Sequence, residues 1–158
     1  MAKESPKTEI ERKFRVAPEW QPPGKGTAYE QGYLSSVKER TVRVRIQGDE
    51  ARLTIKGATK GVSRSEYEYP IPVDDAEAML RELCEQPTIE KRRHVIEHDG
   101  RKWEVDVFGG ENRGLVVAEL ELESEDAAFT KPDWVREEVS DDPRYYNANL
   151  VKHPYTKW

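Results

Sequence analysis

The stretch Thr41-Val42-Arg43-Val44-Arg45-Ile46-Gln47-Gly48-Asp49 decides the fold class. Apolar and polar residues alternate through it with a period of two, which is the pattern of a β-strand with one buried face. Its two arginines point to one face, about 6.6 Å apart, and the valines and the isoleucine point to the other. Gly48-Asp49 predicts a turn, and a similar alternation follows from Ala51 to Lys56. The stretch therefore begins an antiparallel hairpin.

The same alternation recurs along most of the chain and predicts a mainly β protein. We expect eight antiparallel strands, over residues 8–16, 28–36, 41–47, 51–56, 63–71, 88–97, 101–108 and 115–123. One helix is predicted over residues 73–85, because its apolar residues share a face. Short elements are predicted near residues 125–129, 134–139 and 142–150. Eight antiparallel strands with few helices favour a closed barrel or a sandwich.

The composition is unusually polar for a chain of this length. The 158 residues suit one domain that spans residues 1–158. Hydrophobic residues make up only 35% and charged residues 36%, with a mean hydropathy of −0.92, whereas globular domains run nearer to about 45–50% apolar. Tryptophans at positions 20, 103, 134 and 158 are spread over the chain, which disfavours disorder. A polar interior therefore has to be considered.

Charge and cysteine content narrow the possible partners. The net charge is −5 and the pI is about 5.4, which disfavours a general nucleic-acid binder. The single cysteine, Cys84, leaves no internal disulfide and suits a reducing compartment. Residues 1–8 show no secretory signal, and the chain has no apolar run long enough to span a membrane. We therefore expect a cytoplasmic protein without DNA or membrane partners, and its oligomeric state, a homodimer included, stays open.

Charged residues of one sign stand two positions apart on the predicted strands, so they share a strand face. Two carboxylates about 7 Å apart repel by roughly 0.6 kcal/mol in water and about 2.4 kcal/mol at an effective dielectric of 20. A divalent cation would turn the acidic repulsion into coordination, and a phosphate chain would relieve the basic repulsion. The acidic sets are Glu9 with Glu11, Glu66 with Glu68, Glu104 with Asp106, and Glu119 with Glu121 and Glu123; the basic sets are Arg43 with Arg45 and Lys91 with Arg93.

Two interpretations of these charged faces remain open. In the wet-surface interpretation, the apolar faces form the core and the charged faces meet solvent. In the polar-lumen interpretation, the charged faces line a tunnel and the apolar faces pack outward against helices and loops. The second also explains the low apolar fraction. Arg92 lies on an apolar face, and Glu104 and Glu123 lie near strand ends, so we expect these three side chains to be solvated.

The first strand contains Glu9-Ile10-Glu11-Arg12-Lys13-Phe14, which resembles the Glu-x-Glu-x-Lys signature of the CYTH superfamily, the triphosphate tunnel metalloenzymes. The resemblance continues in order over nearly the whole chain. The further blocks are Gln31-Gly32-Tyr33-Leu34, Arg43-Val44-Arg45, Leu53-Thr54-Ile55-Lys56, Glu66-Tyr67-Glu68, Lys91-Arg92-Arg93, Glu104-Val105-Asp106-Val107-Phe108, Glu119-Leu120-Glu121, Trp134 with Glu138-Val139, and Arg144-Tyr145-Tyr146-Asn147.

The resemblance implies a fold and an activity. The family fold is an eight-stranded antiparallel closed barrel around a charged tunnel. Its members hydrolyse inorganic triphosphate, thiamine triphosphate or nucleoside triphosphates with Mg²⁺ or Mn²⁺. This chain is similar to compact bacterial members, many of which act as inorganic triphosphatases, so a metal-dependent triphosphatase is our first prediction. A class IV-type adenylate cyclase and a non-catalytic binder of polyphosphate or nucleotides are the alternatives.

The resemblance also implies residue roles in a two-metal site for a small triphosphate substrate. Glu9, Glu11 and Glu121 would hold a metal that grips the phosphate chain. Glu68, Asp106 and Glu119 would hold a second metal near the attacking water. The residues expected to bind phosphate are Lys13, Arg43, Arg45, Lys56, Arg64, Lys91 and Arg93, of which Lys13, Lys56 and Arg93 are the catalytic candidates. Residues 145–147 either close one end of the tunnel or belong to a packed terminal helix.

Overall fold

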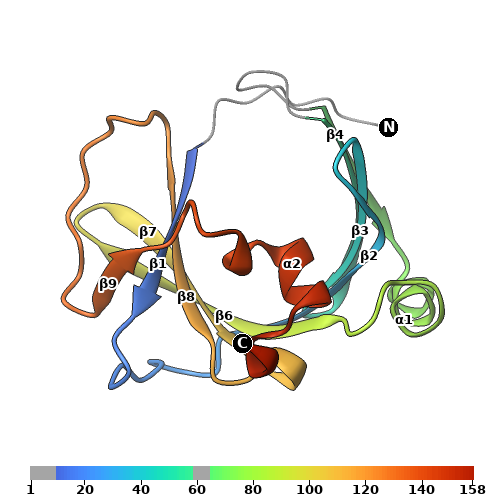
Figure 1. Cartoon of the computed structure of the whole chain (residues 1–158), viewed down its shortest axis with the longest axis horizontal. Coiled ribbons are helices and arrows are strands. Elements are labelled where there is room, and N and C mark those ends of the chain that lie inside the picture. The colour runs from blue at the N-terminus through green and yellow to red at the C-terminus, as the bar shows by residue number, and fades with distance from the viewer. Residues whose placement is uncertain (1–9, 59–64) are drawn as a thin grey trace.

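The computed structural model describes residues 10–58 and 65–158, and its main element is one curved antiparallel sheet (Figure 1). Over these residues the sheet has nine strands in the order β5-β4-β3-β2-β6-β7-β8-β1-β9. The strands are β1 Ile10–Val16, β2 Thr27–Val37, β3 Arg40–Gln47, β4 Glu50–Gly57, β5 Glu66–Ile71, β6 Ile89–His98, β7 Arg101–Phe108, β8 Val116–Leu122 and β9 Val135–Glu138.

Two α-helices lie on opposite sides of the sheet (Figure 1). Helix α1, Val73–Glu82, contacts β2, β3 and β4 from outside the curve. Helix α2, Asn147–Lys152, lies inside the curve. Short 3-10 helices form at Gly110–Asn112, Pro143–Tyr145 and Tyr155–Lys157. None of the helices within residues 10–58 and 65–158 is long and apolar enough to cross a membrane.

The predicted mainly β, antiparallel fold is confirmed, but the closed eight-stranded barrel is wrong. The predicted short element at 134–139 forms a ninth strand, β9, which pairs with β1 at Phe14↔Glu138 and Val16↔Val135. It thereby occupies the edge at which β1 would have to meet β5. Among the described residues, no ladder joins β1 to β5, so the sheet is not closed by hydrogen bonds. Pro70, near the end of β5, also has no N–H to donate to a further strand.

The other predicted elements differ mainly at their ends. Residues 8–9 of the first predicted strand and 63–64 of the fifth lie outside the described residues. The helix predicted over 73–85 ends at Glu82. Residues 125–129 form neither a helix nor a strand. There Ser124 Oγ donates to Asp126 Oδ1 over 2.8 Å, and such a local side-chain hydrogen bond favours a turn over a regular element.

The Asp99-Gly100 turn sets the register that positions the site. Asp99 and Gly100 both adopt positive φ, 50° and 76°, as the two-residue turn of a β-hairpin requires. His98 therefore pairs with Arg101, and the ladder continues to Arg93 opposite Asp106. A shift of one residue would send every side chain of β7 to the other face.

Two apolar clusters cover the convex face, as the polar-lumen interpretation expects. Beneath α1, Ala76 and Leu80 pack against Val44 of β3. Near β9, Phe14 and Trp103 pack with ring centroids 5.5 Å apart. Each fully buried large side chain of this kind stabilises the fold by roughly 1.5–3 kcal/mol. The apolar faces of the strands thus pack outward.

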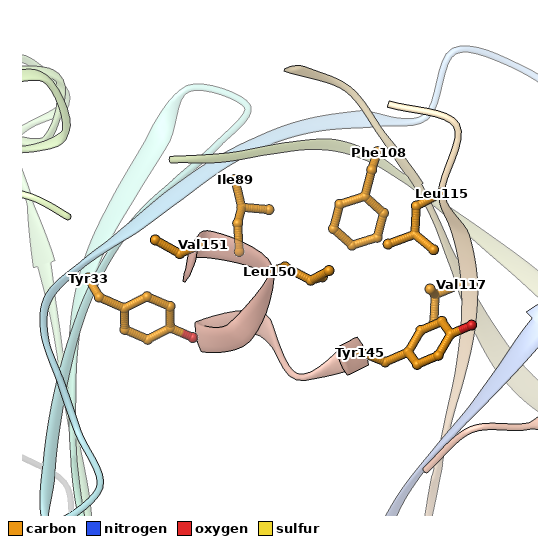
Figure 2. Packing of buried hydrophobic residues seen from close by; sticks show 8 residues of the cluster. All are labelled: Tyr33, Ile89, Phe108, Leu115, Val117, Tyr145, Leu150 and Val151. Atoms are coloured by element: carbon orange, nitrogen blue, oxygen red, sulfur yellow. The ribbon is translucent and has the colours of Figure 1, made fainter. Parts of the chain in front are cut away.

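A third apolar cluster lies on the concave face and was not predicted. Side chains of the sheet and of the segment before β8 point toward α2 and Tyr145 (Figure 2). Leu150 of α2 is only 1% exposed at the centre of this contact. Tyr145 and α2, which begins at Asn147, therefore fill one part of the concave face, whereas Tyr146 between them is exposed. The cluster comprises Tyr33, Ile89, Phe108, Leu115, Val117, Tyr145, Leu150 and Val151.

Candidate active site

The sheet register places the predicted site residues on one face. Directly opposite residues in antiparallel strands point to the same side, and the positions of Tyr33, Ile89, Phe108 and Val117 identify that side as the concave one (Figure 2). The predicted residues that share it are Glu11, Lys13, Arg43, Arg45, Lys56, Glu68, Lys91, Arg93, Asp106, Glu119 and Glu121. Glu9 and Arg64 lie outside the described residues.

Asp106 holds two of the cations predicted to bind phosphate. Lys91 Nζ donates to Asp106 Oδ2 over 2.7 Å, and Arg93 donates from Nε and Nη2 over 2.8 and 2.9 Å. The Lys91 and Asp106 side chains are each 1% exposed. Burial opposes ionisation of Asp106, but the Arg93 hydrogen bond and the Lys91 charge hold its pKa below the ordinary value. Both oxygens of this predicted metal ligand therefore already accept hydrogen bonds from cations.

Three cations surround the ring of Tyr29. Arg93, Arg45 and Lys91 lie 4.9, 5.2 and 5.8 Å from its centroid. Burial, together with the charges of Arg43 and Arg93, lowers the pKa of Arg45 to about 10. These crowded and desolvated charges would be relieved by a bound anion. We call Arg43, Arg45, Lys91 and Arg93 the basic group.

Two buried N–H groups, one in the basic group and one beside it, have no hydrogen-bond partner in the described part of the chain. They are Nε2 of Gln31 and Nε of Arg43. Gln31 is 0% exposed, and its Oε1 accepts from Arg45 Nε over 3.1 Å. A buried donor left without an acceptor costs about 1–3 kcal/mol. This part of the face would therefore be stabilised by a ligand that is rich in acceptors.

The predicted metal ligands of β1 and β8 are neighbours across the ladder. Glu11 lies opposite Glu121, and Glu119 lies opposite Lys13. Burial raises the pKa of Glu119, which is 8% exposed, and the charge of Glu11 raises that pKa further. We call Glu11, Glu119 and Glu121 the acidic group.

The acidic group fits a hard divalent cation by its chemistry. Carboxylate oxygens are the preferred ligands of Mg²⁺ and Mn²⁺, and such an ion would offset both the burial of Glu119 and its repulsion by Glu11. Over residues 10–58 and 65–158, no three carboxylate, imidazole or thiol side chains converge closely enough to hold an ion. The donor set is therefore suitable, and binding would require these side chains to draw together.

The remaining predicted residues lie at the ends of the charged face. Lys13 Nζ donates to the backbone oxygen of Tyr145 over 3.2 Å. Lys56 pairs with Glu66 at 3.5 Å, and Glu68 accepts from Thr54 Oγ1 over 3.0 Å. Because β5 is an end strand of the sheet, Glu68 is not adjacent in the strand order to β7 and β8, which carry the other two residues of the predicted second metal site.

The three charged residues expected to be solvated behave differently from one another. Arg92 and Glu123 are exposed. Glu104 is partly covered, and its carboxylate lies 3.4 Å from Arg93 Nη1. It faces Glu119 across the ladder between β7 and β8. Glu104 therefore borders both the acidic group and the basic group.

Comparison with known proteins identifies the family. The family model described as the CYTH domain matches residues 7–155. The chain belongs to the CYTH family. It is similar to an inorganic triphosphatase of Acetivibrio thermocellus, with 53% identity over 148 residues that cover 93% of this chain and 95% of the relative. An inorganic triphosphatase of Nitrosomonas europaea is 42% identical over 150 residues, covering 91% of this chain and 97% of the relative.

The fold of this CYTH domain also matches a solved structure. A crystal structure of an inorganic triphosphatase gives a TM-score of 0.70 at 40% sequence identity. The match covers 90% of this chain and 93% of that one. The family implied by the ordered motifs is thus confirmed.

The charge pattern overlooked three polar residues of this CYTH domain. Tyr29 carries the ring that the cations surround, Gln31 accepts from Arg45, and Thr54 donates to Glu68. Gln31 and Thr54 are 0% and 2% exposed. All three carry no charge, so a search for same-sign pairs passes over them. Period-two spacing places them on the charged face. Tyr29 and Gln31 are two positions apart on β2 and therefore share a face, and Thr54 lies two residues before Lys56 on β4.

A cavity of about 990 Å³ in the CYTH domain lies mainly on the other face. It is lined by Ala28, Glu30, Arg92 and His94 of β2 and β6, with Glu77 of α1 beside them. Among the described residues predicted for the site, Lys91 alone contributes to its lining. The complementary charges, and not this cavity, therefore define the candidate active site.

Proposed function

We propose that this CYTH domain is a metal-dependent triphosphatase that hydrolyses inorganic triphosphate to diphosphate and phosphate. One observation carries the proposal: a single concave face bears a basic group around Tyr29 and an acidic group on β1 and β8. A phosphate chain complements the first and a divalent cation the second. Two relatives that share most of their length with this chain, both named inorganic triphosphatases, support the choice of substrate.

Glu11, Glu119 and Glu121 would hold Mg²⁺ or Mn²⁺, together with Glu9 of the same sequence motif. When bound, the ion neutralises phosphate charge and lowers the pKa of its bound water. The second ion predicted for Glu68, Asp106 and Glu119 has weaker support, since Asp106 already accepts from Lys91 and Arg93. We therefore favour one ion on the acidic group and assign Asp106 the role of positioning its two cations.

The basic group would bind the phosphoryl oxygens. The forked N–H groups of Arg43 and Arg45 match pairs of phosphate oxygens. Arg93, whose Nε and Nη2 already donate to Asp106, and Lys91 supply positive charge beside them. Arg64 would add a cation from its predicted place beside the face. Lys13 and Lys56, with Arg93, would balance the charge that grows on the oxygens as the bond breaks.

Hydrolysis would then proceed by displacement at a terminal phosphorus. Water forms the new P–O bond, the phosphoanhydride bond breaks, and diphosphate leaves with the bonding electron pair. A carboxylate of the acidic group accepts the proton of the attacking water. Glu119 suits this role because burial and the charge of Glu11 raise its pKa above the ordinary value of a glutamate, which makes it a better proton acceptor.

Incubation of the purified protein with tripolyphosphate, and separately with ATP and thiamine triphosphate, tests the proposal. We expect Mg²⁺- or Mn²⁺-dependent release of phosphate, with the highest kcat/KM for tripolyphosphate. Cyclic AMP and pyrophosphate from ATP would instead identify an adenylate cyclase. Binding without turnover of any of the three would identify a non-catalytic binder. The matched control is Glu11→Gln, which should stay folded and lose turnover.

A further inference from the structure

Gln31 lies where the basic group meets the apolar cluster around α2. It faces Arg45 on one neighbouring strand and Ile89 on the other. On its own strand, Tyr29 and Tyr33 point to the same side. It is therefore between the cations that surround Tyr29 and the apolar residues that pack against Leu150, and it is completely buried.

The orientation of the Gln31 amide is determined by Arg45. Arg45 Nε can only donate a hydrogen bond, so the atom that faces it over 3.1 Å must be the carbonyl oxygen. The NH₂ group then points away from Arg45. It finds no acceptor in the described part of the chain. The amide thus presents a donor that the surrounding protein does not use.

A second unused donor lies on the next strand. Arg43 Nε is also buried and without a partner among the described residues. Because Gln31 pairs with Arg45 and Tyr33 pairs with Arg43, Gln31 and Arg43 are diagonal neighbours, roughly 7–8 Å apart in such a ladder. Both atoms can only donate, which excludes a metal ion as their partner. The adjacent positive charges favour an anionic acceptor.

We infer that Gln31 is a substrate-binding residue whose amide donates to a phosphoryl oxygen of the triphosphate, next to Arg43. The inference rests on the proposed function. The side-chain carbonyl oxygen of Gln31 at the same time accepts from Arg45 and holds it in place. One side chain would thus both orient a cation and contact the substrate. A neutral donor adds a hydrogen bond without adding a like charge to a crowded basic group.

Gln31→Met tests the inference because it keeps the length of the side chain and removes the amide. Hydrogen bonds to charged groups suggest a rise of about tenfold or more in the KM for tripolyphosphate, with kcat changed less than twofold. Calorimetry in EDTA should show a rise of the same size in the Kd for tripolyphosphate. The control is Glu30→Gln on the opposite face of β2, which should leave KM unchanged. A KM for Gln31→Met within twofold of wild type overturns the inference.

Two further measurements test the role of Gln31. Gln31→Glu keeps an acceptor for Arg45 but turns a carboxylate oxygen toward the substrate, so it should bind tripolyphosphate more weakly than wild type even if Gln31→Met fails to fold. The side-chain amide resonance pair that Gln31→Met removes should shift when tripolyphosphate is added to wild type in EDTA. Wild-type affinity in Gln31→Glu, or an unmoved resonance, overturns the inference. If wild type neither binds nor hydrolyses tripolyphosphate, the proposed function fails as well.

Discussion

Lys91 and Asp106 form a salt bridge of 2.7 Å between two side chains that are each only 1% exposed. Asp106 also binds the fork of Arg93, so one carboxylate orients two cations of the basic group. Removing one partner of a buried ion pair leaves the other charge without compensation. Asp106 therefore contributes to the stability of the fold and positions two cations that we propose to bind the substrate.

Asp106→Asn is expected to lower the free energy of unfolding by about 3–5 kcal/mol, as measured by urea denaturation at pH 7. The pKa of Asp106 is depressed in the folded protein. Its stabilisation is therefore present above the unfolded pKa of about 3.9 and is lost as the pH falls further. The deficit of the variant should shrink below about pH 4.

Glu104→Gln is the matched control for Asp106→Asn. Glu104 also pairs with Arg93, at 3.4 Å, but its side chain is 41% exposed. Exposed pairs contribute about 0–1 kcal/mol, so this variant should lose little stability. Equal losses in the two variants would contradict the role assigned to Asp106.

Glu119→Gln should raise the melting temperature of the metal-free protein at pH 8 and abolish turnover. The pKa of Glu119 is raised by burial and by Glu11, so the folded state loses stability as the pH rises and this carboxyl ionises. Scanning fluorimetry in EDTA should show the gain at pH 8 and no gain near pH 4. Glu123→Gln, at an exposed position just after the end of β8, should show no gain at either pH.

Removal of divalent metal should separate binding from turnover. The basic group does not depend on a metal for its charge, so calorimetry in EDTA should still detect tripolyphosphate binding. Phosphate release should stop in EDTA and return on addition of Mg²⁺ or Mn²⁺. Loss of binding in EDTA would show instead that the substrate enters only as a metal complex.

Leu150→Ala should destabilise the protein by about 2–5 kcal/mol, because it removes a fully buried side chain from the contact between α2 and the sheet. Leu83→Ala is the matched control, since Leu83 is 67% exposed. It should change the free energy of unfolding by less than about 0.5 kcal/mol. Chemical denaturation of both variants measures the difference, and similar values would place α2 outside the core.

The face of each charged side chain was predictable, because a strand has a period of two and the stretch around Arg43 and Arg45 shows it clearly. The pairing partners were not predictable from periodicity. Asp106 was expected to bind metal, yet it lies opposite Arg93 and binds two cations. Which residue of β6 faces Asp106 depends on the turn at Asp99-Gly100, so sign patterns within single strands could not reveal this salt bridge.

The open edge of the sheet and the position of α2 depended on contacts between distant segments. Residues 134–139 were predicted only as a short element, and their pattern does not indicate that they pair with Phe14 and Val16. The apolar residues of α2 are equally consistent with packing on either side of the sheet. Tyr33 and Ile89 share a face with charged residues, and only their contact with α2 explains why apolar side chains lie there.

The position of β1 between β8 and β9 has a consequence for how the protein is made. β1 is synthesised before β8 and β9, the strands with which it pairs in the described chain, and Lys13 and Ser140, which share a hydrogen bond, are 127 residues apart. The β2–β5 meander consists of local hairpins that can form early, whereas β1 must wait until β8 and β9 have left the ribosome. A nascent chain would thus assemble arginine-rich strands before it could assemble the carboxylates of Glu11 and Glu121.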